Sequence, residues 1–108
     1  MEQTNNFRPE PYILGGISES FPSGADLNDY TDINIVYYSA NSTTTSTLIN
    51  KPPFNAGFSL KVECNGGTRL IQIAKGAGTN NNAGVEFRRM NNNSGWGPWY
   101  KFEGTMVE

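Results

Sequence analysis

Hydrophobic and polar residues alternate along much of the second half of the chain, which is the pattern of β-strands with one buried face. A first strand further upstream, INIVYY, is rich in β-branched and aromatic residues on both faces. Five strands are therefore predicted, at 33–38 (INIVYY), 58–64 (FSLKVEC), 68–75 (TRLIQIAK), 85–90 (VEFRRM) and 96–102 (WGPWYKF).

Turn signals separate these strands. NGG at 65–67 is a strong hairpin signal, because glycine supplies the positive φ that tight hairpin turns need. The loop at 39–57 contains Pro52 and Pro53, which exclude a central strand there, and its Ser/Thr run is either an exposed strand edge or a flexible tip. Strands at short spacing joined by such turns predict an all-β fold: a small antiparallel meander or sandwich with long loops.

The N-terminal quarter lacks the alternation. Only 12–17 has an extended pattern, and the residues after it are dense in turn formers. One short helical turn is predicted near 26–30, with Asp26 or Ser23 as its cap. Residues 1–11 carry two prolines and no hydrophobic period, so they are expected to be a linker or a lead-in from something upstream.

Composition supports one small domain with a thin core. The chain has 108 residues, of which 36% are hydrophobic and 17% charged, and Asn, Gly, Ser and Thr make up much of the rest. A chain of this length buries only about two-thirds of the surface that its unfolded form exposes. Assembly with other copies is therefore a natural source of additional burial.

Charge and hydropathy argue against several classes of partner. The net charge is −2 and the basic residues are scattered, so we do not expect nucleic-acid binding. No apolar run approaches the ~18 residues that a membrane-spanning helix needs, and the N-terminus lacks the core of a signal peptide. We therefore expect no membrane insertion.

The residue types needed for catalysis or metal binding are scarce. The chain has no histidine, which removes the commonest general base and transition-metal ligand. Asp26, Asp29 and Asp32 are spaced by three, unlike the alternate carboxylates of a calcium loop, so a capped turn is favoured over a cation site. We predict a protein that is not an enzyme and that has no cofactor and no metal site.

Three further reactive side chains have structural interpretations. Glu63 and Glu86 are expected on polar strand faces, paired with basic neighbours. The candidate neighbours are Lys61, Arg88 and Arg89. Cys64, the only cysteine, continues the apolar face of its strand, so a small buried thiol is predicted.

The last predicted strand concentrates the largest aromatic side chains. Trp96 and Trp99 are three positions apart, so an extended strand would point them to opposite faces unless Gly97 and Pro98 bend the chain. One ring is then expected to fill the core, where it buries a large apolar surface and stabilises the fold. The other is left for a sugar face or a subunit interface.

Several segments between residues 26 and 102 form an ordered set of motifs: DLNDY, VYY, TLINKPP, FSLKVE, RLIQIAK, VEFRR and GWGPWYKF. This set resembles the knob domain found near the C-termini of phage and pyocin tail fibres. The resemblance implies a lead-in segment from an upstream fibre at 1–25 and a β-rich knob domain at 26–108. The chain departs from the family's usual Gly-Ile-Tyr strand, since it has Ile35, Val36 and Tyr37, and TLINKPP is a loose version of the family's Asn-Leu-Pro element.

The resemblance implies a compact β-rich head on a homotrimeric fibre, at the virion's tail-fibre tip. Its expected function is to attach the phage to a polysaccharide of the host bacterial surface. The positions that match the family's characteristic residues are expected to be mainly structural. They are Leu27, Tyr30, Tyr37, Gln72, Arg88, Trp96, Trp99 and Tyr100.

Recognition is then expected in the loops, because binding residues usually lie on loops held by a rigid scaffold. The candidate ligand-binding residues are Asn41, Thr44, Asn80, Asn81, Asn82, Arg89, Asn92, Asn93, Trp96 and Trp99. Two other interpretations stay open: a carbohydrate-binding accessory module of a larger surface enzyme, which would be monomeric, and a trimerisation cap without a ligand.

Overall fold

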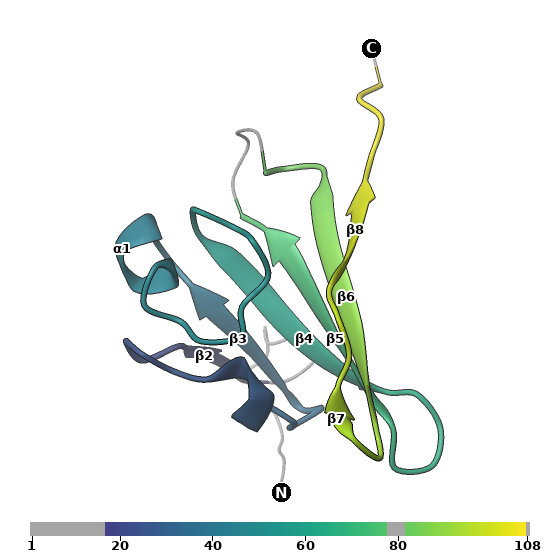
Figure 1. The fold of residues 1–108 in the computed structure, drawn as a ribbon. Coiled ribbons are helices and arrows are strands. Elements are labelled where there is room, and N and C mark those ends of the chain that lie inside the picture. Colours follow the sequence, from purple (N-terminus) through teal and green to yellow (C-terminus); the bar gives the residue numbers. More distant parts are fainter. Residues whose placement is uncertain (1–16, 78–81, 108) are drawn as a thin grey trace, which may run out of the picture.

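The computed structural model describes residues 17–77 and 82–107, and it confirms the predicted all-β fold (Figure 1). The elements are β2 (Ile17–Ser20), the 3-10 turn η1 (Leu27–Asp29), β3 (Ile35–Ser39), α1 (Ser42–Thr45), β4 (Phe58–Cys64), β5 (Leu70–Gly76), β6 (Val85–Asn92), β7 (Gly95–Trp96) and β8 (Tyr100–Glu103). No helix in this part of the chain is long and apolar enough to cross a membrane.

All strands belong to one open sheet, in the order β2-β3-β4-β5-β6-β7, and β8 also pairs with β6. From β3 onward neighbouring strands are antiparallel, as a meander requires. The purely antiparallel prediction is wrong at one edge, where β2 runs parallel to β3. Parallel neighbours need a long connection, and here it is the segment 21–34 that carries η1.

The predicted boundaries hold where alternation is strong and fail where it is weak. β4 has the predicted bounds, whereas the strand expected at 96–102 is split into β7 and β8. β2 covers residues that were assigned to turns, and of the extended piece at 12–17 only Ile17 lies among the described residues. The Ser/Thr run forms α1, neither a strand edge nor an irregular tip.

The predicted helical turn is confirmed at η1. Asp26 is its N-cap, and the side chain of Asp26 accepts a hydrogen bond from the backbone N–H of Asn28 (2.9 Å). This places Leu27, which is fully buried, against the sheet. The cap therefore fixes where the loop enters the core.

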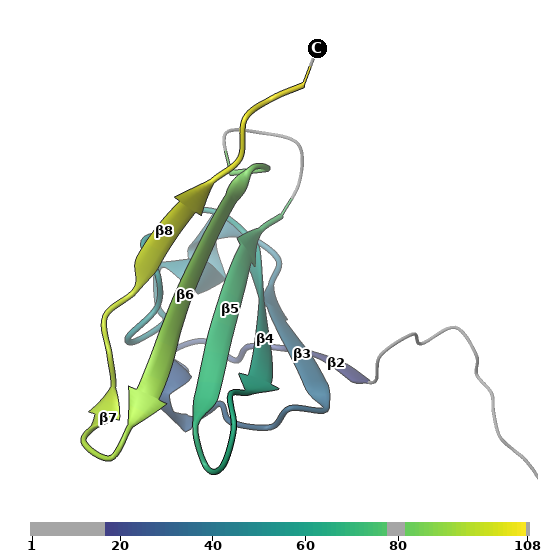
Figure 2. The ribbon, with the colours of Figure 1, turned by 90° about the vertical axis from the view of Figure 1, so that its right-hand side faces the viewer.

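One face of the sheet is covered by loops and the other is open. In Figure 2 the strands β4, β5 and β6 face the viewer, and α1 and the connecting loops lie behind them. The core between sheet and loops consists of Phe21, Leu27, Tyr37, Leu48, Phe54, Phe58, Leu60, Ala74 and Phe87. Aromatic rings fill much of it: Phe54 meets Phe87 edge to face, with centroids 5.0 Å apart.

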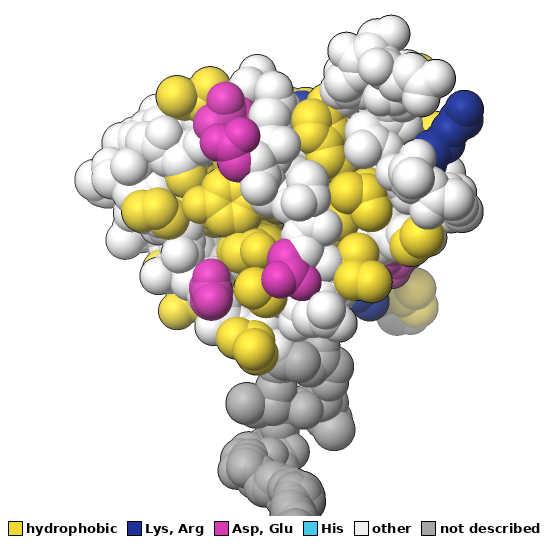
Figure 3. Space-filling view, turned by 90° about the horizontal axis from the view of Figure 1, so that it is seen from below, with side chains coloured by type: hydrophobic (Ala, Val, Ile, Leu, Met, Phe, Trp, Pro, Cys, Tyr) yellow, Lys and Arg dark blue, Asp and Glu magenta, His cyan; other side chains and the backbone are white. Residues whose placement is uncertain are grey.

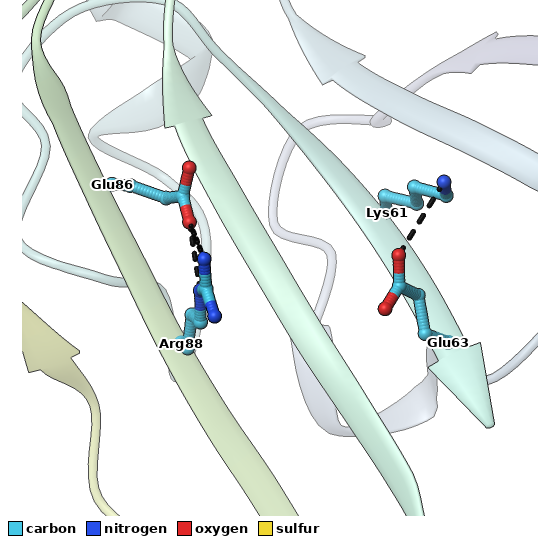
Figure 4. A network of polar contacts seen from close by, with 4 residues as sticks. All are labelled: Lys61, Glu63, Glu86 and Arg88. Atoms are coloured by element: carbon cyan, nitrogen blue, oxygen red, sulfur yellow. Dashed lines mark hydrogen bonds and ion pairs between the residues drawn. The ribbon is translucent and has the colours of Figure 1, made fainter. Parts of the chain in front are cut away.

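Glu63 and Glu86 form ion pairs with basic neighbours on the open face, as predicted. Lys61 Nζ lies 3.4 Å from Glu63 Oε2, and Arg88 Nη2 lies 2.6 Å from Glu86 Oε2 (Figure 4). The prediction of a buried Cys64 is wrong, because this last residue of β4 is exposed. It lies at the end of β4, next to the exposed turn at 65–68.

Two tyrosines of the core are placed edge to face. The ring centroids of Tyr30 and Tyr37 are 4.6 Å apart. Burial raises the pKa of both phenols, and the negative charges of Asp29 near Tyr30 and Asp32 near Tyr37 act in the same direction. The folded protein therefore disfavours the phenolate form of both side chains.

We expect the buried phenols to make the fold sensitive to alkali. A pKa raised on folding stabilises the protein fully below the unfolded value of about 10, and this contribution is lost as pH rises through the folded pKa. The Tyr37→Phe variant should lose less unfolding free energy than the native chain between about pH 9 and pH 11, measured by urea denaturation. Tyr100→Phe, whose ring is 63% exposed, is the control. Identical pH profiles for all three proteins would contradict this expectation.

Gly57 offers a test of the loop packing. A Cβ at this position would lie 2.8 Å from the Ser39 carbonyl oxygen and 3.1 Å from that of Ala40, both backbone atoms. We expect Gly57→Ala to lower the free energy of unfolding by about 1–3 kcal/mol. Gly84→Ala, where the nearest atom would be 3.8 Å away, is the matched control. Equal urea midpoints for the two variants would refute tight packing at Gly57.

Candidate functional site

A buried arginine lies between two tryptophan rings. The guanidinium carbon of Arg89 is 4.7 Å from the ring centroid of Trp96 and 4.6 Å from that of Trp99. Only 5% of Arg89 is exposed, so the cation is stacked in a largely desolvated environment. Stacking of this kind is attractive because the negative faces of both rings meet the positive charge.

A bend brings both tryptophans to the same side. β7 ends at Trp96 and β8 begins at Tyr100, and between them the N–H of Gly97 donates to the Met90 carbonyl (2.8 Å). The strand is thus not extended through Gly97 and Pro98, and this bend, which was the stated exception to the expectation, keeps the two rings from pointing to opposite faces. Neither ring is left over as an exposed platform, since each is partly buried against Arg89.

Gln72 connects Arg89 to the opening loop. Arg89 Nε donates to Gln72 Oε1 (2.8 Å), and Gln72 Nε2 donates to the carbonyls of Leu27 (2.7 Å) and Tyr30 (2.9 Å). Gln72 is fully buried. Its amide therefore ties the centre of the sheet to both ends of η1. We call Gln72, Arg89, Trp96 and Trp99 the Arg–Trp cluster.

The indole N–H groups of the cluster also donate to backbone carbonyls. Trp96 Nε1 donates to Asn28 (3.2 Å), and Trp99 Nε1 donates to Asn50 (3.2 Å). The Asn50 side chain in turn donates to Asp26 Oδ1 (2.9 Å). The end of the chain is thereby joined to two segments that are distant in sequence.

Burial sets the electrostatics of the cluster. It lowers the pKa of Arg89 to about 10, and the negative charge of Asp26 partly opposes this shift. Hydrogen bonds from Asn50 and from the backbone of Asn28 lower the pKa of Asp26. Arg89 Nη2 is buried and has no hydrogen-bond partner among the described residues. The guanidinium is thus cationic at neutral pH and is held mainly by stacking and by Gln72.

The candidate ligand-binding residues do not form one surface. Arg89, Trp96 and Trp99 belong to the Arg–Trp cluster. Asn41 and Thr44 lie in or beside α1, where Asn41 Oδ1 accepts a bond from the Thr44 N–H (2.8 Å) and caps the helix.

The remaining candidates lie at two ends of the sheet. Asn92 and Asn93 lie at the β6–β7 turn, at the end of the sheet away from α1 (Figure 1). Asn82 precedes β6 at the other end, and Asn80 and Asn81 lie outside the described residues. Binding by any of these loop residues stays a prediction.

A groove that was not predicted lies on the open face of the sheet, and of the candidate ligand-binding residues Arg89 and Asn92 line it. It has a volume of about 450 Å³, within the range of small-ligand sites. The strand register aligns Arg88 with Tyr100 and Ile71 with Met90 across this face. The lining residues are Asn65, Arg69, Ile71, Arg88, Arg89, Met90, Asn91, Asn92, Gly97, Pro98, Tyr100 and Phe102. We call this the open-face groove.

The groove was missed because its residues looked like ordinary solvent-facing positions. Its signal was present in the alternation, which places Ile71, Met90 and Phe102 on the face opposite the core. Met90 is 52% exposed and Phe102 is 48% exposed. Apolar side chains that persist on a solvent-facing side indicate a contact surface.

Within residues 17–77 and 82–107, no three His, Cys, Asp or Glu side chains are grouped so that they could hold a metal ion. No family model, curated protein or solved structure matches the chain. Function must therefore be argued from the Arg–Trp cluster and the open-face groove themselves.

We expect Arg89 to matter far more for stability than its neighbour Arg88. Arg89→Ala removes two stacking contacts and leaves Gln72 Oε1 without its donor, so the free energy of unfolding should fall by about 2–4 kcal/mol. Arg88→Ala removes an exposed ion pair and should cost less than about 1 kcal/mol. Urea denaturation followed by circular dichroism measures both. Equal losses in the two variants would show that the cluster does not stabilise the fold.

Proposed function

We propose that the chain is the receptor-binding head of a phage or pyocin tail fibre, which attaches the particle to a polysaccharide of the bacterial surface. One observation carries the proposal. Most residues behind the resemblance to tail-fibre knobs meet in one place, although they are spread along the chain. Leu27, Tyr30, Tyr37, Gln72, Trp96 and Trp99 all belong to the core, pack against it or join the Arg–Trp cluster.

The position of these residues in the core and the cluster supports separate roles for structural residues and for surface residues in this domain. The shared residues pack and form hydrogen bonds, so they act as a scaffold and leave the surface free to vary. Arg88 and Tyr100 are the exceptions, because both lie exposed in the open-face groove. The resemblance gave these two positions a structural role; we propose that they contribute to recognition instead.

Exposed apolar side chains support assembly into a trimer. Ile17, Ile33 and Ile49 are each at least half exposed. On the surface shown in Figure 3, hydrophobic side chains emerge in several patches between acidic ones, and a basic side chain lies at the margin. Burial between copies would remove some of this apolar surface from water.

Trimerisation also suits the expected mode of attachment. A single shallow saccharide site binds weakly, but three linked sites raise the overall affinity by ~10²–10⁴ when they engage together. A head that presents three copies of one groove therefore needs only modest affinity in each.

The test measures assembly and adsorption on the same protein. The domain, carried on its fibre, should have three times the chain mass by light scattering coupled to size exclusion. Fluorescently labelled fibre should bind cells of a susceptible strain. Binding should be lost after periodate oxidation of the cells, which cleaves sugar diols, and kept after protease treatment.

A monomer that still binds sugar would favour an accessory module, and a trimer that binds no strain in a broad panel would favour a trimerisation cap. Loss of binding after protease treatment alone would point to a protein receptor.

A further inference from the structure

We propose that the open-face groove binds an acidic saccharide, through the carboxylate of a sugar acid. The inference rests on the proposed function, since it assumes that the receptor is a polysaccharide. Beyond the proposed function, it specifies that the sugar is negatively charged and that the open face of the sheet binds it. It also moves the expected site away from the loops around α1 and the 77–84 segment.

Two arginines give the groove its charge preference. Arg69 and Arg88 line it with exposed side chains, whereas the third lining arginine, Arg89, is buried in the Arg–Trp cluster. No Asp or Glu is among the lining residues. The side chain of Arg69 has no hydrogen bond or ion pair within residues 17–77 and 82–107, so its planar fork of donors is free to meet a carboxylate. Arg88 is already paired with Glu86, so Arg69 supplies the unpaired positive charge at the exposed lining of the groove, in a chain whose net charge is −2.

Arg88 is held in a fixed orientation. Its Nε and Nη2 both lie close to Glu86 Oε2, at 2.7 and 2.6 Å. Its guanidinium carbon also lies 4.8 Å from the ring centroid of Phe102. Figure 4 shows Glu86 and Arg88 on the strand β6. Two fixed contacts reduce the entropy that Arg88 loses when a ligand binds, and half of its side chain stays exposed.

The apolar part of the groove suits the faces of sugar rings. Ile71 and Met90 are cross-strand partners, and Tyr100 is 63% exposed beside Arg88. Aromatic rings pack against the C–H face of a sugar, while amides bond its hydroxyls. Asn65 and Asn92 line the groove with amides that keep unused polar capacity among the described residues, since Asn65 Nδ2 donates to Met90 Sδ (3.1 Å) and Asn92 Oδ1 accepts from the Ser94 N–H (2.8 Å). Rings and arginines together match a sugar acid better than either a neutral sugar or a simple anion.

The experiment uses the full chain, ¹⁵N-labelled, titrated by NMR with oligosaccharides of galacturonic acid, glucuronic acid and sialic acid. The methyl ester of each oligosaccharide is the neutral counterpart. We expect at least one acid to shift resonances of groove residues and to bind about tenfold more tightly than its ester. Arg69→Gln and Arg88→Gln should each remove this preference and leave binding of the ester unchanged. Tyr100→Ala should weaken both ligands.

Lys75→Gln is the matched control. Lys75 is exposed on the same face of the sheet, next to Glu86 in the register, but it does not line the groove. The variant removes the same charge and should leave both affinities unchanged. If it lowers the affinity for the acid as much as Arg69→Gln does, the preference for the acid comes from the overall charge of the protein and not from the groove.

The outcomes separate this inference from the proposed function. Cell adsorption that is sensitive to periodate but unchanged in the Arg69, Arg88 and Tyr100 variants would overturn the groove and leave the attachment function standing. Equal affinity for acid and ester would overturn the charge preference. If Tyr100→Ala prevents assembly, the open face is an interface with a second copy of the chain and not a sugar site. No binding to any sugar or cell would overturn both proposals.

Discussion

The stacking of Arg89 between Trp96 and Trp99 is the interaction on which the rest of the structure depends. A single open sheet cannot bury both of its faces, so this domain closes one of them with loops. Those loops have no sheet of their own, and they are held largely by contacts to the strands. The Arg–Trp cluster supplies such contacts to the opening loop and to the segment around Asn50. Without it, β7 and β8 would be two short pieces at the edge of the sheet.

The strands could be predicted where local pattern determines structure. β4 follows from strict alternation between Phe58 and Cys64, because the polarity of each residue indicates which face of the strand it occupies. β2 could not be predicted, since all four of its residues are exposed and it owes its conformation to pairing with β3. The same limit explains Cys64, whose exposure depends on where the covering loops end rather than on its strand.

The candidate site was harder to predict because its parts meet only in three dimensions. Trp96 and Trp99 were recognised as important, but their common side depends on the bend at Gly97 and Pro98. Arg89 is among the predicted ligand-binding residues, whereas its alternation with Phe87 in β6 indicates the inward position that the structure shows. The open-face groove combines side chains from β5, β6 and β8, which the predicted meander makes neighbours, but the strand pattern does not show which of their exposed side chains gather around one hollow.

The acceptors of the Arg–Trp cluster have a consequence for how this domain can change. Gln72, Trp96 and Trp99 donate to the carbonyls of Leu27, Tyr30, Asn28 and Asn50, which are backbone groups that every residue type carries. These particular hydrogen bonds therefore fix the path of the loops without depending on the side chains at the acceptor positions, although Leu27, Tyr30 and Asn50 also have side-chain contacts of their own. Such an arrangement lets other exterior positions change while the few donor residues preserve the architecture.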